Sequence, residues 1–432
     1  MGSSFSLLKS CKVCGSPNLT DVFSLEPQFL SATFVKDNLE EGELASIKVP
    51  MTLSLCDTSR NASGCGLLQL REEVEGDLLY RRYFYRSSTN STMVADLKEV
   101  VDDITAKVKL NEGDIVVDIG ANDCTMIQYY PDTVKRVAVE PAKNIDWEGV
   151  DSSVSIVNDY FSAQALKTAL PDQKVKAFSC CAMFYDLPDP NSFVADIKKF
   201  LVSDGVWCIQ LSYLPLMIKN MNFYDICHEH LSYYSIKSLN KLMERNGLYI
   251  FDASTNEVNG GSVRVFITHV ENKNASNETN NLNVSNLILE ESKMDLENPE
   301  TYHRYYEKMT NLSSKVRKYF DAELDKGKRI IGLGASTKGN ILLQFFGITK
   351  DMMPYISEIN TVKIGLKTLG SDFELVSEDF AASLEPSTYF VLPWYFKDEI
   401  VERESSFLES GGALLFPMPY VHLVTKSGEI RL

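Results

Sequence analysis

The sequence predicts an α/β fold in which two doubly wound, mainly parallel sheet units follow a small cysteine-containing region. Short apolar segments alternate with helix-like segments from Asp114 onward, and a second series of the same kind begins at Lys328. Such alternation is typical of parallel sheets covered by helices. The length of 432 residues suits two to four domains at roughly 150 residues each. We therefore expect an N-terminal domain over 1–75, a first α/β domain over 76–270 and a C-terminal α/β domain over 271–432.

The composition is that of an ordinary globular protein and excludes several classes of function. Hydrophobic residues make up 44% of the chain and charged residues 24%, which excludes collagenous, fully disordered and coiled-coil proteins. The 43 Lys and Arg against 59 Asp and Glu give a net charge of -16, which opposes contact with nucleic-acid phosphates or anionic lipid. No apolar run approaches the roughly 20 residues of a membrane span, and the N-terminus lacks a signal-peptide pattern. We expect a cytoplasmic protein without nucleic-acid or membrane partners, of unknown oligomeric state.

The first 75 residues carry a cysteine pattern typical of a structural zinc site. Cys11 and Cys14 form a C-x2-C-G knuckle, and Cys56 and Cys65 follow about forty residues later. Zinc prefers four thiolates in a tetrahedron, and the odd total of nine cysteines argues against a disulfide framework. Because the second pair is spaced C-x8-C, two alternatives stay open: the intervening residues loop out, or Cys56 is not a ligand.

The elements of the first α/β domain follow a Tyr- and Arg-rich segment and a helix expected over 91–109. Apolar runs predict strands, and amphipathic runs between them predict helices. The expected order is strand 115–120, a short helix, strand 136–141, helix 162–170, strand 176–184, helix 193–201, strand 205–213, helix 238–247, strand 248–255 and strand 262–269.

The C-terminal domain begins with a polar stretch, 271–286, that we interpret as a linker, followed by a long helix over 287–326. Apolar and aromatic side chains recur in that helix at three- and four-residue spacing, which indicates packing against a core. The remaining unit, 327–432, is expected to contain strands over 329–336, 353–359, 387–394 and 412–419 and helices over 340–346 and 397–403.

The loop after the first strand of the first α/β domain predicts a nucleoside ligand. In VVDIGAND, the strand delivers Asp118, and Gly120 makes a tight turn at the carboxyl end of the sheet, where doubly wound folds bind ligands. A complete G-x-G-x-x-G is absent. The loop residues Ala121, Asn122 and Asp123 resemble instead the loop that accepts the amino-acid end of S-adenosylmethionine.

Residues after the next two strands support the same ligand. Strand 136–141 ends in Glu140, about twenty residues beyond the loop, where a carboxylate can accept hydrogen bonds from two ribose hydroxyls. Asp159 and Tyr160 follow the next apolar segment, and we expect them near the adenine. This combination favours a methyltransferase over a dehydrogenase.

Two of the five histidines lie close together and predict acid–base chemistry. His228 and His230 flank Glu229. On a strand the two imidazoles would share a face and suggest metal binding, but no third spaced ligand is evident. A side chain that takes up a proton near neutral pH suits general acid–base catalysis near the end of an α/β domain.

Six segments in order carry a family resemblance: CxxCG with CGLLQL, then YFYRSS, VVDIGAND, CHEHLSYYS, NGGSVRVF and GLGASTKGN. Over nearly its whole length the chain resembles the sugar C-methyltransferases that act on nucleotide-linked 4-keto deoxysugars. The resemblance implies a Rossmann-like class I methyltransferase core between a zinc-binding N-terminal domain and a second Rossmann-like C-terminal domain, which close over the sugar nucleotide. It also implies that a base removes the proton next to the ketone and that the enolate attacks the methyl group of S-adenosylmethionine.

The resemblance also implies roles for single residues. His230 matches the general base, Glu229 is placed to orient it or to bind substrate, and Tyr85 matches a tyrosine that lines the sugar pocket. The loop GASTKGN matches one that holds nucleotide phosphates through lysine charge and helix N-terminal amides. The alternative for its lysine is an ordinary solvated side chain. The residues expected to bind the substrate are His228, Tyr224, Arg264, Ser336, Lys338 and Asn340.

The chain departs from the family pattern around the substrate pocket. Cys227 replaces the tyrosine of Y-H-E-H, and Tyr224 or Tyr233 is expected to compensate. Cys124 stands where a glycine is common, Asn259 begins the segment that usually reads H-G-G-S, and AMFYDLPDP stands where N-V-F-A-H is usual. Two alternatives therefore remain beside C-methylation: an O- or N-methyltransferase on a related acceptor, and a nucleotide-sugar-binding protein with a degenerate active site. The residues that argue against the second alternative are Asp118, Glu140, Glu229 and His230.

Overall fold

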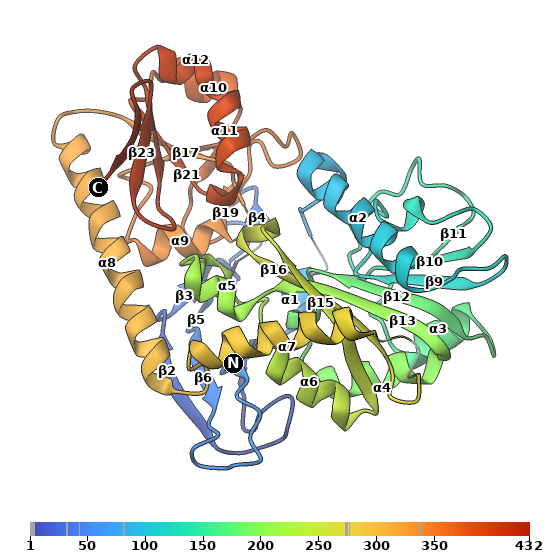
Figure 1. Ribbon diagram of the computed structural model, residues 1–432. Helices are drawn as coiled ribbons and strands as arrows, with labels where there is room; N and C mark the ends of the chain where they lie inside the picture. Colours follow the sequence, from blue (N-terminus) through green and yellow to red (C-terminus); the bar gives the residue numbers. More distant parts are fainter. Residues whose placement is uncertain are drawn as a thin grey trace.

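The computed structural model describes residues 5–31, 33–42, 44–80, 83–272, 275, 277–336 and 338–432 (Figure 1). Within these residues the strands form sheets of seven, nine and four strands and two separate strand pairs. The two larger sheets belong to two α/β units, so the predicted fold class is confirmed. No helix in the described ranges combines the length and apolarity that a membrane span requires.

The first α/β unit is built on the seven-stranded sheet, in the order β11-β10-β9-β12-β13-β16-β15. The first five strands are parallel, whereas β16 and β15 join antiparallel at one edge. All five residues of β9 are buried, as expected for a strand covered on both faces. The strands are β9 (Ile115–Ile119), β10 (Lys135–Val139), β11 (Val154–Val157), β12 (Val175–Cys181), β13 (Leu201–Ser212), β15 (Leu248–Asn256) and β16 (Ser262–His269).

Helices cover the two faces of this sheet (Figure 1). Helix α2 (Ser91–Lys107) begins where the side chain of Asn90 accepts a hydrogen bond from the Met93 N–H, and its apolar side chains pack on one face. On the other face lie α3 (Ala163–Ala169), α4 (Pro190–Phe200) and α6 (Ile236–Arg245). The short helix α5 (Leu214–Lys219) follows β13.

The C-terminal unit is built on the nine-stranded sheet, in the order β24-β23-β22-β21-β17-β18-β20-β19-β4. Its central strands β22, β21, β17, β18 and β20 are parallel. The strands are β17 (Ile330–Leu333), β18 (Tyr355–Ser357), β19 (Lys367–Thr368), β20 (Glu374–Val376), β21 (Thr388–Val391), β22 (Ala413–Phe416), β23 (His422–Thr425) and β24 (Gly428–Arg431). The helices are α9 (Gly339–Phe345), α10 (Glu378–Ser383), α11 (Lys397–Arg403) and α12 (Ser405–Glu409).

The N-terminal region joins both α/β units through strand pairing. Strand β4 (Phe34–Val35) pairs antiparallel with β19 and so forms the edge of the C-terminal sheet. Strand β7 (Leu68–Leu70) pairs antiparallel with β14 (Ser232–Tyr233), which directly follows the histidine pair. The remaining elements are β1 (Phe5–Leu7), β2 (Leu19–Ser24), β3 (Gln28–Phe29), β5 (Lys48–Val49), β6 (Thr52–Cys56), β8 (Glu72–Val74) and α1 (Gly76–Tyr80).

The linker and the long helix expected before the C-terminal unit need correction. Helix α7 (Glu278–Lys293) occupies much of the predicted linker; residues 273, 274 and 276 lie outside the described residues. The side chain of Asn277 accepts a hydrogen bond from the Asn280 N–H and starts the helix, which packs along β15. Most of the helix surface faces solvent and its composition is polar. The sequence therefore has no hydrophobic periodicity that would indicate a helix here.

The predicted helix over 287–326 is therefore two helices. Asp295 has a φ of 55°, which no helix continues through. Helix α8 (Pro299–Leu324) then starts anew, with Pro299 in its first turn and the Asn298 side chain accepting from the Glu300 N–H.

Candidate functional site

A cavity of about 1210 Å³ is lined by residues from the first α/β unit, the C-terminal unit and the segments that connect them. Its volume exceeds the roughly 300–1,000 Å³ typical of a site for one drug-sized ligand. The loops after β9, β10 and β12 contribute on one side, and the loops after β17 and β18 on the other. Ligands of open parallel sheets bind at these carboxyl ends of the strands.

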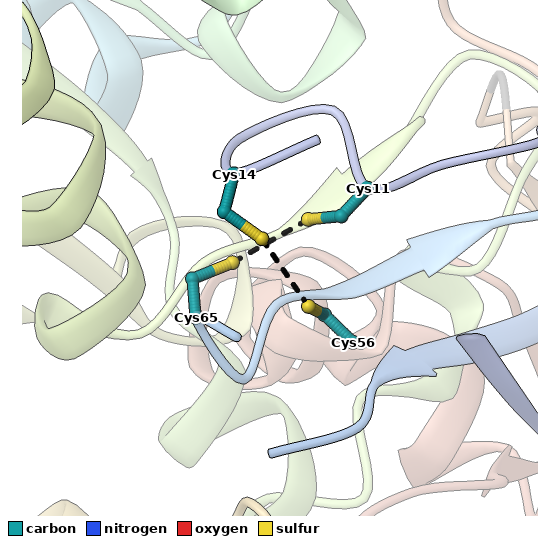
Figure 2. A group of neighbouring side chains, drawn as sticks. All are labelled: Cys11, Cys14, Cys56 and Cys65. Carbon is teal, nitrogen blue, oxygen red and sulfur yellow. Dashed lines mark hydrogen bonds between the residues drawn. The ribbon is translucent and has the colours of Figure 1, made fainter. Parts of the chain in front are cut away.

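Four cysteines of the N-terminal region come together in space, as Figure 2 shows. Cys11 and Cys14 lie in the turn after β1, Cys56 ends β6, and Cys65 precedes β7. The four Sγ atoms lie within 4.8 Å of one another. Two of the separations, Cys11 to Cys65 and Cys14 to Cys56, are 3.4 and 3.5 Å.

This arrangement fits zinc. With Zn–S bonds of about 2.3 Å, tetrahedral ligands stand about 3.8 Å apart, close to the separations seen here. The Cys56 N–H donates to the Leu67 carbonyl at 2.8 Å, which closes the loop between Cys56 and Cys65. The long C-x8-C spacing therefore loops out and leaves Cys56 within reach of the other three sulfurs.

The loop after β9 has the geometry of a nucleoside-binding corner. Gly120 has a φ of 74°, and a Cβ at this position would lie 2.9 Å from the Met183 Cγ, so only glycine fits. The side chain of Glu140, after β10, accepts from the Asn122 N–H and from the Ala142 N–H, both at 2.8 Å. These bonds hold the carboxylate at the cavity while leaving lone pairs for hydroxyl donors.

Buried carboxyls at this corner have raised pKa values. Burial raises the pKa of Asp118 to about 7, against a hydrogen bond donated by Ser179 at 3.0 Å, while the nearby Glu140 adds to the rise. Burial likewise raises the pKa of Glu140, although the Ala142 and Asn122 N–H groups oppose the shift.

The structure brings six of the eight residues predicted for the cofactor to the cavity. Asp123 instead accepts hydrogen bonds from the Ser88 N–H at 2.9 Å and from Thr125, so it shapes the loop. Asp159 is also outside the described cavity lining. The predicted residues in the lining are Asp118, Gly120, Ala121, Asn122, Glu140 and Tyr160.

Glu229 and His228 are held by a serine from the N-terminal region. The Ser31 hydroxyl donates to the Glu229 carboxylate and accepts from the His228 backbone N–H at 3.2 Å. The His228 Nδ1 faces the Ser31 N–H at 3.3 Å, and its Nε2 faces the Val49 carbonyl at 3.2 Å. Burial lowers the pKa of His228 to about 4, and burial raises that of Glu229 against the Ser31 hydrogen bond. His228 is thus a neutral positioning group whose ring is fully engaged.

His230 lies in the cavity lining in a form that can accept a proton. Its ring lies against that of Tyr185, with centroids 4.0 Å apart and the ring planes tilted by 40°, and one ring N–H donates to the Asp225 carbonyl. Burial, together with the positive charge of Lys338, lowers the pKa of His230 well below its ordinary value. Its imidazole is therefore neutral at physiological pH, and among the described residues the second ring nitrogen is left as an acceptor.

Lys338 reaches the same part of the cavity from the C-terminal unit. Its Nζ donates to Asp225 at 2.5 Å and lies 5.1 Å from the centroid of the Tyr224 ring. Burial lowers the pKa of Lys338, but Asp225, Tyr185 and Cys227 together outweigh burial and raise it well above the ordinary value. Lys338 is therefore a buried, charged side chain paired with Asp225, not an ordinary solvated loop lysine. Tyr224, Tyr85 and Ser336 also line the cavity.

Two residues expected to bind substrate lie elsewhere, which corrects those expectations. Arg264 points from β16 toward α2, where it pairs with Asp96 at 3.0 Å and with Asp103. Asn340 is 6% exposed and accepts from the Ser371 hydroxyl at 2.5 Å, so it braces a turn of the C-terminal unit. Neither belongs to the described cavity lining.

The cavity contains functional groups that sequence reasoning missed. Among the described residues, the buried Oδ1 of Asp186 has no hydrogen-bond partner, and burial together with Glu229 raises the pKa of Asp186 well above the ordinary value. It lies in the segment AMFYDLPDP, whose departure from the family pattern was a signal. The other groups missed in the lining are Tyr80, Glu358 and Lys363; Ser31 acts through its contacts with Glu229 and His228.

Comparisons with known proteins agree with this arrangement. Family models match residues 11–80 as a zinc binding domain, residues 92–252 as a methyltransferase domain and residues 257–419 as a C-methyltransferase C-terminal domain. The chain is 28% identical to the C-methyltransferase NovU of Streptomyces niveus over 424 residues, which cover 97% of each protein.

Solved structures with limited similarity include two methyltransferases. One is an S-adenosylmethionine-dependent methyltransferase from Clostridium acetobutylicum, with 11% identity, a TM-score of 0.32, and coverage of 41% of this chain and 92% of that one. The other is the magnesium protoporphyrin IX methyltransferase of Synechocystis, with 10% identity, a TM-score of 0.32, and coverage of 42% and 87%.

Proposed function

Because this chain belongs to the S-adenosylmethionine-dependent C-methyltransferases that combine a zinc-binding, a methyltransferase and a C-terminal domain, we propose that its acceptor is a nucleotide-linked keto-deoxysugar. The methyl group goes to a carbon next to the ketone. One observation carries this proposal: His230 lines a single cavity that reaches from the corner at Asp118 and Glu140 to the C-terminal unit.

The cofactor end of the cavity suits S-adenosylmethionine. We assign the loop of Gly120, Ala121 and Asn122 to its amino-acid end and the Glu140 carboxylate to its ribose hydroxyls. Asp118 supports the loop from the end of β9, and we assign Tyr160, which lines the cavity, to the adenine. Bound S-adenosylmethionine supplies an electrophilic methyl group on a positively charged sulfur, whose bond to that group breaks as the acceptor carbon attacks.

His230 is the proposed general base. Its free ring nitrogen takes the proton from the carbon next to the ketone, and the C–H electron pair moves to form an enolate. The enolate carbon then forms the new carbon–carbon bond, and the proton on His230 is released to solvent. The tilted contact with Tyr185 and the bond to the Asp225 carbonyl hold the ring in place for this transfer.

Hydrogen-bond donors must stabilise the enolate oxygen, because Cys227 offers no hydroxyl. Asp186 is suited to this task because burial favours its protonated form and its buried Oδ1 has no hydrogen-bond partner among the described residues. Glu229 is placed beside it to bind the substrate, and Tyr85 lines the sugar pocket. The buried charge of Lys338 further favours negative charge in this part of the cavity.

The zinc site and the C-terminal unit have supporting roles. Zinc at the four cysteines fixes the N-terminal region that presents Ser31 to Glu229. Ser336 and Lys338 are assigned to the phosphates of the nucleotide. Thiolate ligands and five further free cysteines suit a reducing compartment, so we place the enzyme in the cytoplasm.

The experiment that tests this function incubates the purified protein with S-adenosylmethionine and a panel of nucleotide-linked 4-keto-6-deoxysugars, with analysis by mass spectrometry and NMR. We expect one sugar to gain the mass of one CH2 group, with the new methyl on the carbon next to the ketone. A methyl found on oxygen or nitrogen would overturn C-methylation in favour of the O- or N-acceptor alternative. Binding of S-adenosylmethionine with every sugar returned unmethylated would overturn the proposed acceptor class.

A further inference from the structure

One residue of the zinc knuckle, Lys12, reaches the cavity lining with its charged side chain. It lies between Cys11 and Cys14 (Figure 2), where a C-x2-C knuckle requires no particular side chain. The Lys12 side chain is only 3% exposed, and its Nζ donates to the Glu73 carboxylate at 2.5 Å and to the Pro188 carbonyl at 3.2 Å. Because a lysine ammonium is seldom buried without a partner, these two contacts fix where the side chain lies.

Both partners of Lys12 belong to the cavity lining. Pro188 lies in the loop between β12 and α4, two residues after Asp186. Because proline has no backbone N–H, the carbonyl is the only main-chain group of Pro188 that can form a hydrogen bond. The bond from Lys12 therefore connects the knuckle to this loop.

The loop also contacts the knuckle in the opposite direction. The Asn191 side chain, in the first turn of α4, donates to the Lys12 carbonyl at 2.8 Å and to the Val13 carbonyl at 3.1 Å. Between these contacts, Asp189 begins α4 by accepting from the Ser192 N–H at 3.1 Å. The knuckle thus contacts the end of the loop on both sides of Asp189.

The other end of the loop is fixed by the core of the first α/β unit. Phe184 is fully buried, and the Tyr185 carbonyl accepts from the Leu231 N–H at 2.9 Å, directly after His230. Asp186 lies between this fixed end and Pro188. Its position relative to His230 therefore depends on how the segment after it is held.

The knuckle also contacts the segment that follows His230. The Lys12 N–H donates to the Gln69 Oε1 at 3.0 Å, and Gln69 of β7 pairs with Ser232 of β14. The proposed base and the proposed enolate donor therefore lie on two segments that meet the same knuckle.

We propose that Lys12 is a positioning residue for Asp186: its hydrogen bond to the Pro188 carbonyl holds the loop that presents the Asp186 carboxyl to the enolate oxygen. Since Glu73 pairs with the Lys12 charge, Lys12 acts through the position of the loop. This inference rests on the proposed function, because it takes Asp186 as a donor to the enolate oxygen. It adds a second connection, besides Ser31, between the N-terminal region and the reacting groups.

The test measures kcat and KM of the full-length zinc protein with the keto sugar that the methylation assay identifies. In Lys12→Met the loop loses its bond to the knuckle, and kcat should fall about 10- to 100-fold, because a displacement of about 1 Å can cost that much. Zinc content, measured by inductively coupled plasma mass spectrometry, and S-adenosylhomocysteine affinity, measured by calorimetry, should not change. Lys12→Arg keeps the charge and the donors and should recover most of the turnover.

The matched control is Lys293→Met. It removes an exposed lysine from its pair with Glu290 on α7, and kcat should stay as in the unchanged chain.

A double-mutant cycle separates positioning of Asp186 from a general loss of structure. Asp186→Ala removes the donor and should lower kcat by about 10²- to 10³-fold. If Lys12 acts through Asp186, adding Lys12→Met to Asp186→Ala should lower kcat by no more than about twofold further, whereas the effects of independent sites multiply. A further loss as large as that of Lys12→Met alone would overturn the inference.

The remaining outcomes also decide a point. If the unchanged chain methylates none of the keto sugars, the proposed function fails and the inference fails with it. If the unchanged chain methylates one sugar and Lys12→Met is equally fast, only the inference fails. If Asp186→Ala is too slow to measure, turnover recovered in Lys12→Arg supports the inference, and turnover as low as in Lys12→Met overturns it.

Loss of zinc from Lys12→Met is resolved by a second variant. Lys12→Gln keeps a polar group in the knuckle and is measured in the same way, with the same expected fall in kcat. Loss of zinc from this variant too would assign Lys12 to the metal site and overturn the inference.

Discussion

The hydroxyl of Ser31 donates a hydrogen bond to the carboxylate of Glu229, which lies 198 residues further along the chain. Ser31 belongs to the N-terminal region, whereas Glu229 stands between the two histidines, within the first α/β unit. The same hydroxyl accepts from the His228 N–H at 3.2 Å. The N-terminal region therefore does more than bind a metal, because it holds a carboxylate at the cavity.

Replacement of this serine should slow methyl transfer without removing the cofactor site. Ser31→Ala leaves the buried Glu229 carboxylate without its hydroxyl donor, and such a bond contributes about 1.5–3 kcal/mol, so kcat should fall by about 10- to 100-fold. The affinity for S-adenosylhomocysteine should not change, because Glu140 and Gly120 lie in another part of the cavity. Steady-state kinetics and calorimetry check this, with Ser24→Ala as the control; an unchanged kcat in Ser31→Ala would contradict it.

Loss of one zinc ligand should remove the metal and then activity. Cys56→Ser is expected to lower the zinc content from one ion per chain toward zero, measured by inductively coupled plasma mass spectrometry. Because metal binding is coupled to folding of such small regions, the N-terminal region should open and displace Ser31, and kcat should fall about tenfold or more. Cys208→Ala, which alters a buried cysteine of the first sheet, should keep its zinc. A Cys56→Ser protein with full zinc content would show that Cys56 is not a ligand.

Substitutions of Gly113 and Gly120 distinguish the cost of a positive φ from the cost of a close contact at the cofactor corner. Gly113 and Gly120 have φ values of 81° and 74°, but only a Cβ on Gly120 meets another atom, Met183 Cγ at 2.9 Å. Gly113→Ala should cost about 1–2 kcal/mol of unfolding free energy through its positive φ alone. Gly120→Ala should cost more and should also weaken S-adenosylhomocysteine binding. Urea unfolding and calorimetry compare the two, and equal behaviour would contradict the role of the contact.

The buried carboxyl of Asp118 should make stability depend on pH. Its pKa is raised by burial from 3.8 to about 7, so between these values the folded protein binds a proton that the unfolded chain releases. Stability from this group is therefore full below about pH 4 and is lost as the pH rises through about 7. Asp118→Asn should reduce the fall in unfolding free energy between pH 5 and pH 8, measured with urea. An identical pH dependence in both proteins would contradict the raised pKa.

The sequence predicted the elements whose residues pack regularly. The strand at 115–119 and the helix at 91–107 were within reach because burial gives each a clear apolar pattern. Helix α7 was missed, since its exposed surface is polar and its start depends on the Asn277 cap. The pairing of β4 with β19 was also out of reach, because it joins two-residue segments far apart in the chain.

Only those residues of the candidate site that belong to a local sequence motif could be predicted. Glu140 and the Gly120 loop followed from a strand and turn pattern, and His230 from a motif resemblance. The expectation that Arg264 binds substrate is wrong, because side chains alternate between the two faces of β16 and that of Arg264 points toward Asp96 on α2. A sequence motif does not show this direction. No sequence motif identifies Ser31, because its partner Glu229 is close to it only in the folded chain.

The most direct test of the account is whether His230 removes the proton next to the ketone. The keto sugar identified as substrate is incubated in D2O with enzyme and S-adenosylhomocysteine, so that no methyl transfer follows, and the α-proton signal is recorded by NMR. We expect the unchanged enzyme to replace this proton with deuterium, and His230→Ala to lose the exchange while retaining S-adenosylhomocysteine binding. Exchange at the same rate in His230→Ala would contradict the assignment of His230 as the base.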